Sequence, residues 1–92
     1  MSRAFVNEDA EGREFSYNLP DRDDPSFDEA AAWALIEGWN QGDLRGAELA
    51  TGFKWGESRL LPHVERLLAQ AQKQHDERIQ QLAERFIRRG KS

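Results

Sequence analysis

Apolar residues recur at helical spacing along the C-terminal part of the chain, from Ser58 to Phe86. At about 100° per residue they fall on one stripe that does not drift. The residues of this stripe are Leu60, Leu61, Val64, Leu67, Leu68, Ala71, His75, Ile79, Leu82 and Phe86. Neither Gly nor Pro occurs between Val64 and Arg89. The pattern therefore predicts one long amphipathic helix of roughly 28 residues and about 42 Å.

A helix of this length exceeds the width of a domain of 92 residues. The rest of the chain is then too short to cover its far end. We therefore predict an exposed apolar edge on the second half of the helix, which self-associates or docks on a protein partner. The predicted interface residues are Ala71, His75, Ile79, Leu82 and Phe86. The polar segment from Gln70 to Arg78 leaves one alternative, a break near Gln74 with the second piece folding back.

A first helix is predicted over residues 27–41. Ser26 and Glu29 have the spacing of a capping box, in which each side chain caps a backbone N–H of the first turn. The alanines that follow are strong helix formers. Gly42 is a natural residue to end the helix.

A second, short helix is predicted over residues 44–51, with Asp43 as its N-terminal cap and Gly52 after its last residue. Its small residues, Gly46, Ala47 and Ala50, would allow close packing on a neighbouring helix. The connector that follows carries Phe53 and Trp55, which we interpret as a plug over the helical core. An exposed recognition patch is the alternative.

Residues 1–25 are predicted to form an N-terminal arm, separate from a helical domain over residues 26–92. Phe15, Tyr17 and Leu19 alternate with polar residues, which favours an extended segment. This segment could pair with the apolar run at residues 4–6 as a small β-hairpin, or the arm could stay unpaired. The acidic stretch 21–28 lacks the Gly and Glu positions of an EF-hand loop, so we interpret it as a solvated loop.

The predicted fold is all-α, with the short helix pair packed on the first half of the long C-terminal helix. The hydrophobic core then draws on all three helices and on the aromatic connector. Its predicted members are Trp33, Leu35, Ile36, Trp39, Leu49, Phe53, Trp55, Leu61, Val64 and Leu68.

Composition narrows the class of protein. Apolar residues make up 38% and charged residues 33% of the chain, and Cys is absent. No apolar run approaches the roughly 20 residues of a membrane helix, and a secretory signal is not recognisable. His63 and His75 lack the spacing of a zinc site. We therefore expect a cytoplasmic, non-catalytic protein with no metal or other cofactor, no membrane contact and no evident small-molecule substrate.

Charge is unevenly distributed along the chain. Residues 1–58 carry five basic and thirteen acidic side chains, a net charge of −8, whereas residues 59–92 carry eight basic and four acidic ones, a net charge of +4. Arg85, Arg88 and Arg89 are candidates for contact with nucleic acid or an acidic protein surface. Alternatively, they only complement the dipole of the helix end.

A helix-turn-helix is a further hypothesis for the stretch from Leu44 to Leu68. Its turn would be 53–57, and its recognition helix would begin near Arg59, the only residue there suited to reading base edges. Glu48 stands where a small residue is usual, so the match to the motif is poor.

The N-terminus offers a resemblance to a known family. Residues 1–9, Met-Ser-Arg-Ala-Phe-Val-Asn-Glu-Asp, followed by Leu19-Pro20-Asp21-Arg22, resemble the leader of some Gre-type transcript-cleavage factors of bacterial RNA polymerase. The resemblance covers about a dozen positions, and that family has both a coiled-coil hairpin and a C-terminal domain, for which this chain is too short. It implies a bacterial cytoplasmic protein connected with transcription.

Overall fold

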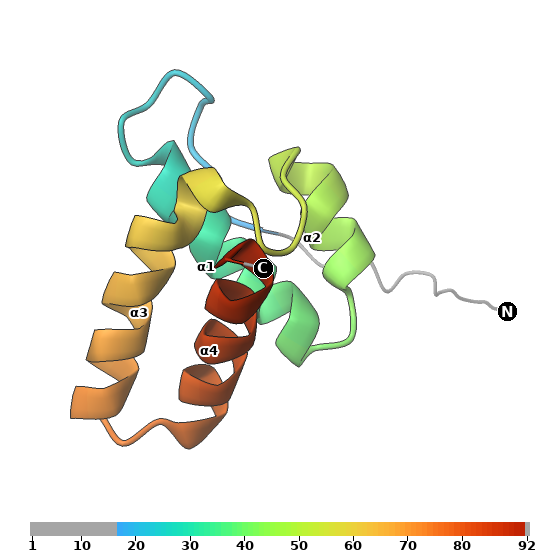
Figure 1. Ribbon diagram of the computed structural model, residues 1–92. Coiled ribbons are helices and arrows are strands. Elements are labelled where there is room, and N and C mark those ends of the chain that lie inside the picture. The colour runs from blue at the N-terminus through green and yellow to red at the C-terminus, as the bar shows by residue number, and fades with distance from the viewer. Residues whose placement is uncertain (1–16, 92) are drawn as a thin grey trace, which may run out of the picture.

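The computed structural model describes residues 17–91, and this part of the chain is built from helices (Figure 1). In chain order these are α1 (Phe27–Asn40), α2 (Leu44–Thr51), the short 3₁₀ helix η2 (Ser58–Leu60), α3 (Leu61–Lys73) and α4 (Glu77–Lys91). The predicted all-α class is confirmed. Most of the predicted N-terminal arm, including residues 4–6 of the hairpin hypothesis, lies outside the described residues.

α1 has the predicted position but a different start. The Ser26 side chain makes no capping hydrogen bond to the helix. Instead its hydroxyl donates to Asp24 Oδ1 at 2.7 Å, and its backbone N–H donates to the same oxygen at 2.8 Å. The capping-box prediction is therefore wrong, because Ser26 is used in the turn before the helix. At the other end Gly42 has a φ of 77°, the left-handed conformation that suits a glycine after a helix.

α2 packs against the last turns of α1. Gly38 makes this possible, because a Cβ atom added there would lie 2.5 Å from Cβ of Ala47. Gly52 ends α2 in the left-handed conformation, as predicted. Asp43 does not cap α2 through its side chain, contrary to the prediction, because its carboxylate accepts a hydrogen bond of 2.9 Å from the Tyr17 hydroxyl.

The single long helix predicted over 58–86 is wrong. The chain leaves the helix at Gln74 and reverses direction, so that α3 and α4 lie side by side as an antiparallel pair (Figure 1). His75 adopts a φ of 58°, and the Asp76 N–H donates to the Ala71 carbonyl at 2.9 Å. This is the hydrogen-bond pattern of a Schellman ending, with His in the place usually taken by Gly. The alternative of a break near Gln74 is the arrangement that the structure has.

Asp76 begins the next helix. Its Oδ1 accepts a hydrogen bond of 3.2 Å from the Ile79 N–H, which satisfies one of the free donors at the start of α4. The polar run between the two helices thus contains both a C-terminal ending and an N-terminal cap. Because α4 folds back, the apolar stripes of α3 and α4 face each other and α1.

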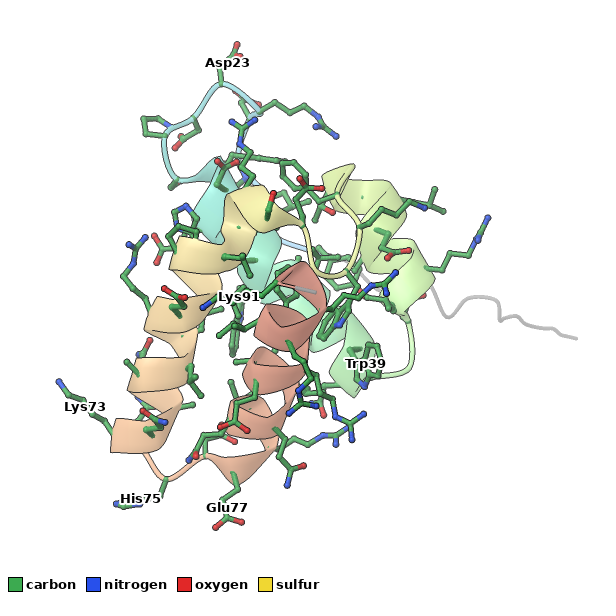
Figure 2. The ribbon with its side chains drawn as sticks, in the orientation of Figure 1. Asp23, Trp39, Lys73, His75, Glu77 and Lys91 are labelled. Atoms are coloured by element: carbon green, nitrogen blue, oxygen red, sulfur yellow. The ribbon has the colours of Figure 1, made fainter. Side chains whose placement is uncertain are left out.

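The predicted exposed edge is consequently part of the core. Leu82 and Phe86 are completely buried and Ala71 is 3% exposed. Ile79 is half-buried, and His75 is exposed at the tip of the α3–α4 turn, pointing away from both helices (Figure 2). The described chain therefore does not present these five residues as one exposed interface.

The core lies between α1, α3 and α4. Leu35, Ile36 and Val64 are fully buried, as predicted, and so is Leu60. The other predicted core residues that pack against this centre are half-buried: Trp39, Phe53, Trp55, Leu61 and Leu68. Two assignments to the core are wrong, because Trp33 is 39% exposed and Leu49 is 73% exposed. Leu49 lies on the outer side of α2, since Ala47 and Thr51 take the face toward the core.

Candidate interaction groove

Three aromatic rings from three separate segments meet beside α4. Trp39 comes from the end of α1, Trp55 from the connector after α2, and Phe86 from α4. The centroids of the two indole rings are 4.6 Å apart, and Trp55 meets Phe86 edge-on at 4.9 Å. Trp55 thus covers the core side of α4, as a plug would. Trp55 also contributes to an open surface, which agrees with the alternative interpretation of the connector as an exposed patch.

A groove runs along this aromatic cluster. Its volume is about 540 Å³, and its lining consists of Trp39, Trp55, Arg85, Arg88 and Arg89. Trp39 lies on the opposite side of α4 from α3 (Figure 2). We call these five residues the Trp–Arg groove. All three arginines that the sequence singled out are therefore brought to one site.

The backbone holds Trp55 in its place. Its N–H donates to Oε2 of Glu48 in α2 at 2.9 Å. The next residue, Gly56, has a φ of 90°, and a side chain there would collide with the Arg89 stem. The connector can therefore approach the end of α4 closely only with glycine at this position.

Arginines dominate the side of α4 that borders the groove. Arg78, Arg85 and Arg89 recur at spacings of seven and four residues, which places them on one face of the helix. Arg78 continues this face toward α1, where its Nε donates to Oδ1 of Asn40 at 2.8 Å. Lys91 lies on the other side of the helix and pairs with Glu65 of α3 at 3.6 Å.

Arg85 and Arg88 are exposed. Within residues 17–91 neither of them forms an ion pair. Guanidinium groups carry planar sets of N–H donors that match carboxylates or phosphates. The groove therefore combines ring faces for apolar contact with donors for an anion.

A second hollow lies between α1, α3 and the start of α4, beside the α3–α4 turn. It has a volume of about 280 Å³ and is lined by Trp33, Leu67, Ala71 and Ile79, with Gln70, Gln74 and Asp76 at its polar edge. The exposed ring of Trp33 is its main apolar feature. This hollow has no charged cluster that would indicate what fills it.

The remaining residues considered from the sequence lie apart from a common site. His63 Nδ1 is 2.7 Å from an Arg66 guanidinium nitrogen, and His75 is at the α3–α4 turn. In the described part of the chain, His, Asp and Glu side chains nowhere gather in a group of three that could hold a metal ion. None of the helices between residues 17 and 91 is long and apolar enough to cross a membrane.

The elements of the helix-turn-helix hypothesis pack differently from that motif. α2 packs on α1, whereas α3 packs on α4 and α1. Arg59, the residue considered for base reading, forms a 2.9 Å ion pair with Asp28 of α1. The structure therefore gives the motif no support, and Arg59 has a structural partner.

The acidic loop before α1 is organised by its own residues. The N–H and hydroxyl of Ser26 hydrogen-bond to Asp24 and lower the pKa of its carboxyl group. The Arg22 guanidinium lies 5.3 Å from the centre of the Phe27 ring. These contacts between its own residues stabilise the conformation of part of the loop.

The sequence indicated the three arginines of the groove, and it offered surface exposure of Trp55 only as an alternative and of Trp39 not at all. Trp39 and Trp55 look like core residues in the sequence, because large aromatic residues at helical or connector positions usually are. Their joint exposure depends on where α4 packs.

Comparison of the chain with protein-family models, with curated proteins and with solved structures finds no match.

Proposed function

We propose that this is a small, non-catalytic interaction protein that docks on a protein partner through the Trp–Arg groove. The observation that carries the proposal is the pairing of Trp39 with Trp55 at 4.6 Å in a groove that three arginines complete. Trp and Arg are, with Tyr, the residue types enriched among the residues that dominate binding energy at protein interfaces.

The chemistry of the lining supports binding rather than catalysis. The lining offers indole faces, aliphatic stems and guanidinium donors. Arginine stays protonated and cannot serve as a general base, and the indole N–H is only a donor. The groove thus lacks a nucleophile or base in its own lining. It can, however, anchor an apolar side chain and pair with a negative charge.

In this proposal the Trp–Arg groove, and not the apolar stripe predicted from the sequence, is the docking surface. Leu82 and Phe86 are buried within the chain, and Phe86 supports the groove through its contact with Trp55. We place the protein in the cytoplasm, on the basis of a cysteine-free sequence.

Site-specific photo-cross-linking tests the proposal. A photoreactive phenylalanine analogue is placed at position 81, one helical turn before Arg85 on the same side of α4, and at position 72 on α3 as the control, since Gln81 and Gln72 are both exposed. In the cells from which the chain comes, we expect a protein adduct from position 81 and none from position 72. We expect Arg88→Glu to remove the adduct. Equal adducts from both positions, or none from position 81, would contradict the proposal.

A second candidate is nucleic-acid or RNA-polymerase binding connected with transcription. The same groove favours it, because bases stack on aromatic faces and phosphates pair with arginines. The resemblance at residues 1–9 and 19–22 points the same way, although residues 1–9 lie outside the described part. This candidate predicts binding that weakens steeply with salt and is lost on charge reversal at Arg85, Arg88 and Arg89.

A further inference from the structure

We propose that the partner presents an acidic segment, in which aspartate or glutamate residues flank an apolar side chain, to the Trp–Arg groove. The inference rests on the proposed function and names the chemistry of the partner. The apolar side chain packs on Trp39 and Trp55, and the carboxylates pair with Arg85 and Arg88.

The first step of the argument is local charge. α4 carries five basic and two acidic side chains over residues 77–91, which gives a net charge of +3. The acidic ones, Glu77 and Glu84, leave Arg85 and Arg88 without an ion pair among the described residues. A surface with exposed, unneutralised arginines attracts an anionic partner.

The second step concerns the shape and lining of the groove. The groove has a volume of about 540 Å³ and is widely open to solvent, so a segment that lies across the surface can reach its lining. The two indole rings are inclined by 35° to each other, and Trp55 rests on Phe86, so the pair forms an apolar floor that is supported through Trp55. A purely ionic partner would leave this floor unused, whereas a segment with an apolar side chain uses both parts of the lining.

The third step separates an acidic protein segment from a nucleic acid. Residues 17–76 carry six basic and eleven acidic side chains, a net charge of −5. Glu48, which holds the Trp55 N–H at 2.9 Å, is itself next to the groove. A phosphodiester chain that continued past the arginines would meet the Glu48 carboxylate beside Trp55, and the rest of the described chain adds net negative charge. A short acidic segment confines its charges to the basic area.

The test uses the full chain and a short capped peptide in which glutamates flank a leucine and a phenylalanine. Binding is followed by tryptophan fluorescence and by calorimetry at low salt. The matched peptide has glutamine in place of every glutamate. We expect the glutamine peptide to bind at least tenfold more weakly, because it retains the apolar anchor and loses the ion pairs.

Matched protein variants locate the binding site. Arg85→Glu with Arg88→Glu reverses two charges in the groove, and Arg66→Glu with Lys73→Glu makes the same change on exposed residues of α3. We expect the groove variant to lose at least tenfold in affinity for the acidic peptide, and the α3 variant to change by less than about twofold. Circular dichroism checks that both variants melt like the parent chain.

Four outcomes overturn the inference. They are equal binding of the two peptides, equal loss in the two variants, preferential binding of single-stranded oligothymidylate, and self-association of the free chain that the groove variant abolishes. A protein adduct at position 81 without acidic-peptide binding would refute the acidic partner and leave the proposed function standing. If both the adduct and the peptide binding are absent, both proposals fail.

Discussion

Tyr17 joins the segment before α1 to the start of α2. Its hydroxyl donates to Asp43 Oδ2 at 2.9 Å and accepts from Gln41 Nε2 at 3.0 Å. Burial raises the pKa of the Tyr17 phenol above its ordinary value near 10, and the Asp43 carboxylate adds to the shift, against an opposing hydrogen bond from Gln41. The fold therefore favours the protonated phenol.

Tyr17→Phe is expected to lower the free energy of unfolding by about 1 kcal/mol at neutral pH, the usual net contribution of such a hydrogen bond. Because the pKa is raised on folding, the contribution of Tyr17 is complete below pH 10 and is lost as the pH rises through the raised pKa. Urea unfolding of both proteins at several pH values measures this. The difference between them should narrow above pH 10, and a constant difference would contradict the assignment.

Gly38 is required for the close approach of α1 and α2. Gly38→Ala is expected to destabilise the protein by about 1–3 kcal/mol, the range for overpacking a filled interior, because its Cβ would lie 2.5 Å from that of Ala47. Helix propensity alone would make the same change stabilising by about 1 kcal/mol. The sign of the change in the free energy of unfolding therefore shows which of the two effects is larger. Thermal unfolding measures it, with Glu37→Ala at the exposed neighbouring position as the control.

At the scale of elements, the α3–α4 turn carries a conformational cost at His75. A non-glycine residue in the left-handed region costs about 1–2 kcal/mol, and His75 has a φ of 58°. We expect His75→Gly to stabilise the protein by about 0.5–1 kcal/mol, since glycine also adds entropy to the unfolded chain. Gln74→Gly is the matched control, because φ is −89° there and the change should be destabilising. Chemical denaturation measures the free energy of unfolding of both variants. A change in the same direction in both would contradict this account.

The elements differ in how far the sequence predicts them. α1 and α2 were predictable because glycines stand at the positions that end them, Gly42 and Gly52, where left-handed backbone is needed. The break between α3 and α4 is harder to see, since His75 takes the position at which glycine would have marked it. Asp76 before an apolar-periodic run was the available indication of a new helix, and it does cap α4.

The candidate site was predictable only in part. Arg85 and Arg88 stand out because the basic charge gathers at the end of the chain. Trp39 and Trp55 carry no local pattern that would join them to those arginines. They meet only because α4 folds back against α1 and the connector, which is a consequence of tertiary packing and not of sequence spacing.

At the scale of the whole molecule, α4 contributes both to the hydrophobic core and to the Trp–Arg groove. Its apolar face completes the core through Leu82 and Phe86, and its basic face forms the wall of the Trp–Arg groove. Among the four α-helices of residues 17–91, α4 has the largest segregation of apolar and polar faces, as expected for a helix that has one buried and one solvated side. The groove therefore depends on the same packing that holds the bundle together.

Leu82→Asp separates the folded-back arrangement from the long exposed helix. With an exposed helix, the change would break assembly and leave residues 26–68 folded. In this structure Leu82 is completely buried between the helices, so an aspartate there buries a charge and removes apolar contact, which places the loss above about 4 kcal/mol. We therefore expect circular dichroism to show loss of helix along the whole chain. Gln81→Asp, at the exposed adjacent position, should have little effect. A Leu82→Asp protein that kept its helices while light scattering showed a fall in mass would contradict this packing.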